Sequence, residues 1–388
     1  MKIVKDFFHK ESSVGIILIV VTILALILQN SQFSQNYNNF LHIPMMIKFS
    51  DLEISKPLIL WVNDGLMAIF FFLIGLEVKR EVLQGHLSSI KEVTLPTIAA
   101  LGGMIVPAVI FYLLNHNDTF FIKGWAIPTA TDIAFALGIL SLLGKRVPVS
   151  LKIFLMALAI IDDLGAIIII ALFYTTKLST LSITIASIAL VLLYIVNRLN
   201  ISKRSPYILL GIILWVSVLK SGVHATLAGV ALAFMIPLNV KNEDGKEINM
   251  AGEFEKELHS FVSFFVLPLF AFVNAGVDLS NIKMENLLSS VPMGIFLGLF
   301  IGKQLGVFGF SYLAIKFKLA SLPKDSNFLN LYGVSILTGI GFTMSLFVDS
   351  LAYNDTDIFN YTDKLAILLG SFLSAIVGYL LLKFSRKG

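Results

Sequence analysis

The chain is dominated by long runs of apolar residues that carry almost no charge and recur from one end to the other. A helix that crosses a lipid bilayer needs about 20 such residues, because it must traverse an apolar layer about 30 Å thick. The sequence therefore predicts an all-α integral membrane protein, with residues 1–388 forming a single polytopic domain. Polar turns separate twelve predicted transmembrane helices, at residues 12–29, 58–78, 95–114, 121–143, 150–174, 180–197, 205–219, 223–238, 257–276, 291–315, 327–350 and 363–383.

The composition excludes most other classes of protein. Hydrophobic residues make up 57% and charged residues 14% of the chain, whereas soluble domains are about 45–50% apolar and about 25% charged. A water-soluble globule and a disordered chain are therefore excluded. The sequence has no cysteine, so disulfides and cysteine-ligated metals are excluded too. We expect no cofactor and no nucleotide, since no phosphate-binding loop is evident, and no nucleic-acid partner; the partner we expect is the lipid bilayer.

The distribution of basic residues predicts how the helices are oriented. With the N-terminus assigned to the cytoplasm, 21 of the 29 lysines and arginines fall in cytoplasmic segments, 7 on the opposite side, and Lys303 within a helix. Basic residues collect in the cytoplasmic loops of membrane proteins, so we expect both termini in the cytoplasm. The first run follows Lys2, Lys5 and Lys10, but no small-x-small cleavage pattern comes after it, so we expect a retained helix rather than a signal peptide.

Two adjacent acids within one predicted helix are the main candidates for function. A charge near the middle of a membrane helix costs at least about 2.5–3.5 kcal/mol. Asp162 and Asp163 lie at the centre of the run 150–174. Successive helical residues point about 100° apart, so the two carboxylates face different sides of one cavity. Two carboxylates in a low dielectric resist double ionisation, which suits the pair to bind protons and a small cation in competition.

Other charged residues lie closer to the ends of the predicted helices. For Asp64, Glu77 and His224 a functional and a structural explanation are both open, because carboxylates near the membrane surface are solvated and a lone histidine is often a packing residue. Asp132 and Lys303 lie inside predicted helices, where a charge needs a functional reason.

Two of the predicted helices contain residues that disfavour a continuous helix. Pro128 removes an amide donor within the fourth, and β-branched threonines follow it. We expect Asp132 to offset the positive ends of helix dipoles at this interruption. We expect Lys303 either to offset negative helix ends or to pair with Asp162. In the eleventh predicted helix, the residues that disfavour a continuous helix are Gly333, Gly339 and Gly341. The fourth and eleventh helices occupy corresponding positions in predicted inverted repeats over about 95–174 and 291–383. Such paired interruptions mark binding sites in membrane proteins.

The longest connection on the extracytoplasmic side, residues 30–57, contains a predicted two-stranded ribbon at 46–54. An exposed two-stranded ribbon is marginally stable alone. It therefore either packs on its own helices or pairs with another subunit, and the sequence leaves both alternatives open.

Six segments spread over the whole chain carry a family pattern in order: FLIGLEVKRE (72–81), PTATDIA (128–134), IDDLGA (161–166), SGVHAT (221–226), LPLFAF with NAG (267–276) and GKQLG (302–306). The set resembles NhaA-type bacterial sodium/proton antiporters, a family with inverted repeats. The resemblance implies an electrogenic, pH-regulated secondary antiporter in the bacterial inner membrane that exports Na⁺, and also Li⁺, in exchange for external protons. It also implies a homodimer formed through the ribbon at 46–54.

The resemblance implies roles for single residues as well. Asp163 corresponds to the principal carrier of Na⁺ and H⁺, and Asp162 to the second essential acid. Thr131 and Asp132 correspond to residues that line the site, and Lys303 to a residue that neutralises helix ends and exchanges partners with Asp162. The family has a histidine beside the counterpart of Glu255, where this chain has Lys256, which leaves the detail of the pH response open. The positions associated with that response are Glu77, Arg80, Glu81, His224, Glu255 and His259.

Two other functions fit part of the pattern. An intramembrane aspartic protease also uses two membrane aspartates, here Asp132 and Asp163. The acids lack its tyrosine–aspartate and Gly-x-Gly-Asp patterns, and a protease has no use for a second interrupted helix or for Lys303. A symporter of Na⁺ with an organic anion is closer, but it would need an additional substrate cavity. We therefore expect a transporter and not an enzyme.

Overall fold

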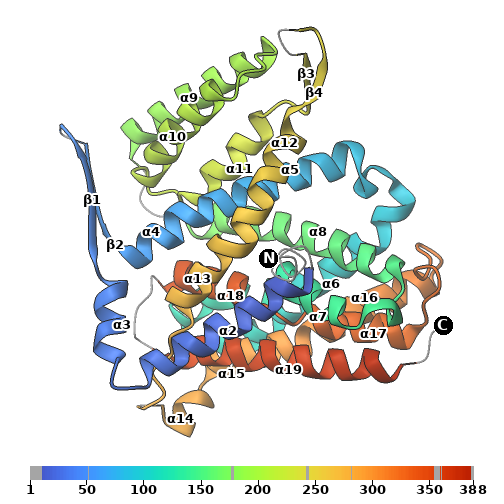
Figure 1. Cartoon of the computed structure of the whole chain (residues 1–388). Coiled ribbons are helices and arrows are strands. Elements are labelled where there is room, and N and C mark those ends of the chain that lie inside the picture. The colour runs from blue at the N-terminus through green and yellow to red at the C-terminus, as the bar shows by residue number, and fades with distance from the viewer. Residues whose placement is uncertain are drawn as a thin grey trace, which may run out of the picture. The chain divides into compact units, whose positions relative to one another are not determined.

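The computed structural model describes residues 11–50, 52–175, 179–241, 244–280, 282–353, 359 and 361–385. Most of these residues are helical, and the strands form two small two-stranded sheets (Figure 1). Some basic residues on which the predicted orientation depends lie outside the described residues, as does Asp51 of the predicted ribbon. These basic residues are Lys2, Lys5, Lys10, Lys177, Arg386 and Lys387.

Within the described residues, nine helical segments are long and apolar enough to cross a bilayer. A tenth candidate is the pair Phe328–Leu337 and Phe342–Tyr353, which bends by 44° at its break. Ser205–Leu219 and Thr226–Met235 are apolar but shorter. The predicted all-α membrane class is confirmed, and the number of twelve crossings stays a prediction. The nine are Ser12–Gln29, Leu58–Gln84, Glu92–Asn115, Phe121–Leu142, Val149–Phe173, Thr180–Arg198, Met250–Asn274, Ser290–Lys316 and Thr362–Phe384.

The chain divides into two compact units. The first comprises Met1–Gln35, Ser89–Ala166 and Asn274–Gly388, and the second comprises Asn36–Ser88 and Ile167–Val273. The helix α8 (Val149–Phe173) begins in the first unit and ends in the second.

The first unit contains both segments in which the sequence predicts an interrupted helix. Its elements are α2 (Glu11–Gln29), α6 (Ile90–Asn115), η3 (Phe121–Thr129), α7 (Ile133–Leu142), η4 (Gly144–Arg146), α14 (Met284–Leu287), α15 (Ser290–Leu297), η6 (Gly298–Gly302), α16 (Lys303–Lys316), α17 (Phe328–Leu337), α18 (Phe342–Tyr353) and α19 (Thr362–Phe384).

Packing and capping within the first unit follow from identifiable residues. Helices α6 and α16 approach closely because glycines meet where they cross: a Cβ on Gly102 would clash with the carbonyl oxygen of Gly306, and a Cβ on Gly306 with that of Gly102. Small residues at such crossings let helix backbones come together in membranes. A reciprocal capping box fixes the start of α17, with Asn327 accepting from the Asn330 amide at 2.8 Å and Asn330 accepting from the Asn327 amide at 3.2 Å.

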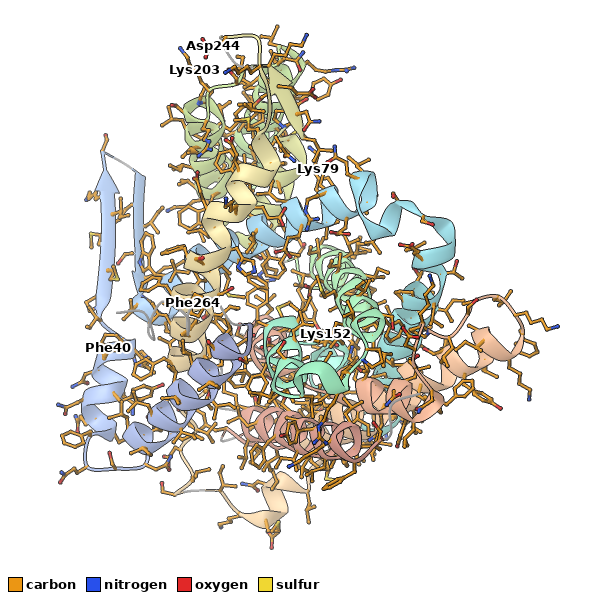
Figure 2. All side chains as sticks on the ribbon, turned by 45° about the vertical axis from the view of Figure 1, so that its right-hand side comes forward. Phe40, Lys79, Lys152, Lys203, Asp244 and Phe264 are labelled. Carbon is orange, nitrogen blue, oxygen red and sulfur yellow. The ribbon has the colours of Figure 1, made fainter. Side chains whose placement is uncertain are left out.

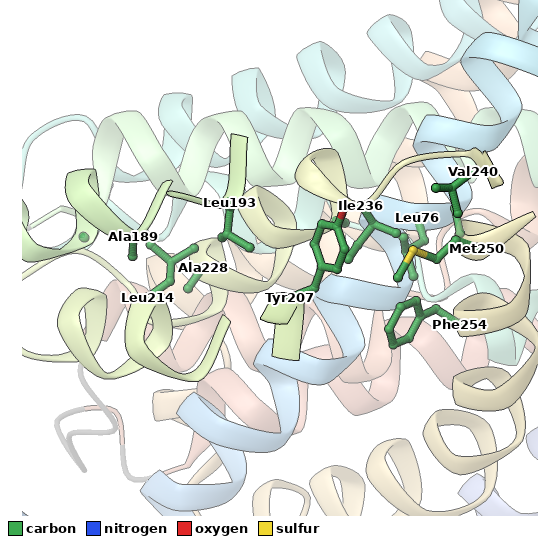
Figure 3. Packing of buried hydrophobic residues seen from close by; sticks show 13 residues of the cluster. Leu76, Ala189, Leu193, Tyr207, Leu214, Ala228, Ile236, Val240, Met250 and Phe254 are labelled. Carbon is green, nitrogen blue, oxygen red and sulfur yellow. The ribbon is translucent and has the colours of Figure 1, made fainter. Parts of the chain in front are cut away.

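The second unit has its own apolar core. In Figure 3, Leu76 from α5, Tyr207 from α10, Ile236 beyond α11 and Met250 from α12 belong to one buried cluster. Lys79, labelled in Figure 2, donates to the carbonyls of Phe234 and Ile236, which end α11. The elements are α3 (Ser34–Leu41, starting in the first unit), β1 (Pro44–Phe49), β2 (Leu52–Pro57), α4 (Leu58–Trp61), η1 (Val62–Leu66), α5 (Met67–Gln84), η2 (His86–Ser88), α9 (Thr180–Arg198), α10 (Ser205–Leu219), α11 (Thr226–Met235), β3 (Asn239–Lys241), β4 (Glu247–Asn249), α12 (Met250–Phe261), η5 (Val262–Val266) and α13 (Leu267–Asn274, ending in the first unit).

An antiparallel ribbon occupies the region 44–57 and leads into α4 (Figure 1). Its register pairs Met45 with Lys56 and Lys48 with Glu53, and both strands extend beyond the predicted range 46–54. Asp64 lies nearby, 2.5 Å from the Lys56 ammonium, so this acid is compensated by a partner from the ribbon.

Candidate functional site

The first interruption lies between η3 and α7. The 3₁₀-helix ends at Thr129, Ala130 has extended backbone angles (φ −80°, ψ 151°), and α7 begins at Ile133. Pro128 lies inside η3, two residues before the extended backbone. Carbonyls before the break are bonded by hydroxyl groups, since Thr129 donates to Ala126 at 2.8 Å and Ser345 of α18 donates to Ile127 at 2.8 Å.

The second interruption lies between α17, which ends at Leu337, and α18, which begins at Phe342. Gly339 is at the break, where a Cβ would lie 2.5 Å from the carbonyl oxygen of Leu299, so a close approach of backbone requires glycine there. Gly341 also lies at the break. Gly333 does not, because it belongs to α17, where a Cβ would lie 2.7 Å from the Leu382 side chain of α19. Its role is therefore close helix packing.

Asp132 connects the two interruptions. Its Oδ1 accepts from the Phe135 amide at 2.9 Å, which caps the start of α7, and its Oδ2 accepts from the Thr343 amide at 3.1 Å and from the Thr343 hydroxyl. Its own amide donates to Ile340 at 2.7 Å. A single buried carboxylate thus offsets the partial positive charge at the starts of both α7 and α18.

Asp162 is shared between a cation and a hydroxyl group. Its Oδ2 lies 2.5 Å from the Lys303 ammonium and 2.7 Å from the Thr131 hydroxyl. Lys303 is 0% exposed and Asp162 is 2% exposed. The Oδ1 of Asp162 is also buried and has no hydrogen-bond partner among the described residues. Removing either member of a buried ion pair leaves an uncompensated charge, which costs about 3–5 kcal/mol.

The Thr131 hydroxyl links this pair to the second interruption. It lies 3.0 Å from the Thr338 carbonyl, just beyond the end of α17, and 2.7 Å from Asp162. A hydroxyl has one proton to donate, so Thr131 donates to one of these two oxygens at a time and offers its lone pairs to other partners.

Asp163 follows Asp162 on α8 and is buried, with 2% exposure. Because adjacent helical residues point about 100° apart, its side chain leaves α8 in a different direction from that of Asp162. The structure thus brings Asp162, Thr131 and Lys303 into direct contact, with Asp163 next to them in sequence. Asp132 makes its contacts at the same two interruptions.

Several groups at the site have no counterpart in the sequence prediction. Thr343 comes two residues after Gly341, but nothing in its sequence surroundings indicates a contact with Asp132. The carbonyls of Thr338 and Ile340 are backbone atoms, which the residue type does not reveal. Only the tendency of the glycines to interrupt the helix indicates that such carbonyls are exposed at all.

A second charged cluster lies in the second unit. The Arg80 guanidinium lies 2.8 Å from Glu255 and 2.6 Å from Glu81. Glu77, half-buried, lies one turn before Glu81 on α5. Arg80 and Glu255 line a cavity of about 470 Å³ together with the exposed side chains of Lys256 and His259. Five of the six residues that the resemblance associates with pH response therefore lie on α5 and α12.

The sixth residue, His224, has a separate environment in the same unit. Its Nε2 lies 2.6 Å from the carbonyl oxygen of Tyr174, which follows the end of α8. The contact is typical of a packing residue, which is one of the two explanations that the sequence left open for His224.

Comparison with known proteins identifies the relatives of the chain. The Na⁺/H⁺ antiporter 1 family model matches residues 5–382. The Na(+)/H(+) antiporter NhaA of a Sulfurovum species is 69% identical over 387 residues, which is 100% of this chain and 99% of the relative. The proteins of the same name from a Nitratiruptor species and from Campylobacter concisus are 64% identical over 97% of this chain and 97% of the relative, and 60% identical over 99% and 93%.

Proposed function

The chain belongs to the Na⁺/H⁺ antiporter 1 family, and on this premise we propose that it is a secondary antiporter that exports Na⁺ from the cytoplasm in exchange for external protons. The observation that carries the proposal is the buried Asp162, which holds Lys303 at 2.5 Å and Thr131 at 2.7 Å beside Asp163. A buried carboxylate with an exchangeable partner can be satisfied in turn by a lysine, a proton or a metal cation. We propose that Li⁺ is transported at the same site, because it is also a small hard cation.

The transport mechanism is competition for the two acids. A small hard cation binds best to carboxylate, hydroxyl and carbonyl oxygens. Asp163, Asp162 and the Thr131 hydroxyl supply such oxygens, and backbone carbonyls at the interruptions supply more. At low cytoplasmic pH the acids hold protons and exclude Na⁺, whereas at alkaline pH they are anions that accept it, Asp162 in competition with Lys303.

Turnover requires that the site be occupied when it changes its accessible side. The Na⁺-loaded and protonated forms cross, while the empty anionic form does not, because an uncompensated charge at membrane depth is costly. If both acids release protons for each cation bound, each cycle moves net charge. Exchange is then electrogenic, and the membrane potential drives Na⁺ outward.

The proposed topology has twelve transmembrane helices with both termini in the cytoplasm of a bacterium and the protein in its inner membrane. The ten candidate crossings and the two shorter apolar helices together correspond to the twelve apolar runs. The interruptions at 130–132 and 338–341 occupy related positions in inverted repeats over about 95–174 and 291–383, and Asp132 contacts both.

The proposed assembly is a homodimer that pairs through the ribbon on the extracytoplasmic side. Met46 and Ile47 of β1 are each 59% exposed. An exposed apolar strand is a favourable place for a second copy of the chain to bind. Regulation by pH is proposed to act through Glu77, Arg80, Glu81, Glu255 and His259, with His224 as a further candidate.

The proposed function is tested by flux measurements in proteoliposomes with imposed pH gradients, with and without a membrane potential. We expect Asp163→Asn to abolish Na⁺-dependent proton flux while the protein remains folded. Asp64→Asn is the matched control, because Asp64 also pairs with a lysine but lies in the second unit, and its flux should stay within about twofold of wild type. Retained exchange in Asp163→Asn would refute the assignment.

A further inference from the structure

The turn that precedes Lys303 is not α-helical. Residues Gly298–Gly302 form a π turn, which the backbone amide of Lys303 closes by donating to the carbonyl of Gly298. A π turn contains one more residue than an α turn, so the side chains that follow are rotated by about 100° relative to a continuous α-helix. The direction of the Lys303 side chain toward Asp162 therefore depends on this turn.

Gln304 holds the π turn to a neighbouring helix. Its Nε2 donates to the carbonyl of Phe300, inside the turn, and its Oε1 accepts from the Tyr332 hydroxyl of α17 at 2.7 Å. The Gln304 side chain is buried, and the Tyr332 ring packs edge-on against Phe308 at 5.1 Å between ring centres. Gln304 thus satisfies a carbonyl of the turn and fixes the turn to α17 through one amide group.

The other end of α17 contacts the same ion pair. The Thr338 carbonyl, just beyond this end, lies 3.0 Å from the Thr131 hydroxyl, and that hydroxyl lies 2.7 Å from Asp162. One end of the helix therefore reaches the carboxylate through Thr131. Near the other end of α17, the Tyr332 hydroxyl contacts Gln304 and so holds the π turn that orients the Lys303 ammonium.

We propose that Gln304 and Tyr332 are positioning residues that hold the Lys303 ammonium on Asp162 and so set how strongly Lys303 competes with Na⁺ for that carboxylate. This inference rests on the proposed function, since it assumes that Na⁺ displaces Lys303. When the contact between Gln304 and Tyr332 is removed, Lys303 leaves Asp162 more readily. The apparent KM for Na⁺ then falls, while the maximal rate changes little.

The decisive variant is Tyr332→Phe, which removes the hydroxyl and keeps the ring that packs on Phe308. Its matched control is Tyr312→Phe on α16, where the ring also packs against Phe308, at 6.2 Å, and against Phe328, at 5.5 Å. At alkaline pH in proteoliposomes, we expect Tyr332→Phe to lower the apparent KM for Na⁺ about threefold to tenfold, the range for one hydrogen bond. Tyr312→Phe should match wild type.

Gln304→Leu is the second variant, because it removes the contacts to Phe300 and Tyr332 together and should lower KM at least as far. A wild-type KM in either folded variant, an equal change in both tyrosine variants, or a loss of maximal rate with unchanged KM would each overturn the inference. Failure of the proposed function looks different. It would be seen as an absence of Na⁺-dependent proton flux in the wild-type protein. That result would overturn the inference as well, because Lys303 would then have no Na⁺ to compete with.

Discussion

The two units each contain an arginine or lysine paired with a carboxylate, in opposite surroundings. In the first unit the side chains of Lys303 and Asp162 are 0% and 1% exposed and lie 2.5 Å apart. In the second unit those of Arg80 and Glu255 are 36% and 18% exposed and lie 2.8 Å apart. The distances within the two pairs are similar, so the pairs differ mainly in the exposure of their side chains. A buried pair cannot separate unless another charge replaces one member, whereas water and salt screen a more exposed pair.

This difference suits the two pairs to different tasks. Separation of Lys303 from Asp162 has to coincide with the arrival of a proton or a cation, which couples the pair to cargo. Separation of Arg80 from Glu255 costs little, so that pair can adjust activity without taking part in each transport cycle.

The largest effect that would test this contrast is expected from Asp162→Asn. Neutralising the carboxylate leaves the Lys303 ammonium buried without its counter-charge, so we expect a loss of about 3–5 kcal/mol in unfolding free energy and loss of exchange. Glu255→Gln makes the matched change at the more exposed pair, and we expect it to cost less than about 1 kcal/mol. Thermal unfolding and proteoliposome flux measure both effects.

A double variant separates the two consequences of Asp162→Asn. Adding Lys303→Met removes the uncompensated cation, so most of the lost stability should return. Exchange should remain absent, because the carboxylate is still missing. Exchange at the wild-type rate in the double variant would show that the buried pair is structural and would remove the contrast between the two units.

A smaller effect is expected from Thr131→Val, which keeps the shape of the side chain and removes its hydroxyl. The change deprives Asp162 of a donor and the proposed Na⁺ site of an oxygen. A lost buried hydrogen bond costs about 1–3 kcal/mol, so the apparent KM for Na⁺ should rise at least about fivefold. Flux measured against Na⁺ concentration gives KM, and Thr131→Ser, which keeps the hydroxyl, should stay close to wild type. Equal values for the valine and serine variants would contradict this role.

The confirmed membrane class could be predicted because it depends on residue type, and the interrupted fourth and eleventh helices stay a prediction made on the same basis. Apolar runs require a lipid environment, and Gly339 and Gly341 disfavour a helix wherever it lies. The resemblance to the family is confirmed by the match over residues 5–382. For Lys303 the sequence allowed two partners, and the structure places it on Asp162.

Other features could not be predicted because they depend on tertiary contacts. Gly333 has the same residue type as Gly339, yet it packs inside α17 against α19. The π turn before Lys303 has no marker of its own in the sequence. The contact between Asp132 and Thr343 joins residues 211 positions apart, so it follows only from the arrangement of the two interruptions.

The smallest expected effect concerns Lys256, at the position where the resemblance described above leads us to expect a histidine. Histidine loses its charge near pH 6.5, whereas a lysine ordinarily stays charged well above neutrality. Below about pH 6 the side chains of wild type and Lys256→His both carry a positive charge beside Glu255, so their exchange rates should agree. Above about pH 7 only the variant has lost that charge, and the two curves of rate against pH should separate by a few-fold at most, because the residue is exposed. Lys256→Arg keeps the charge and should follow wild type throughout; curves that differ below pH 6, or that coincide everywhere, would remove this position from the proposed pH response.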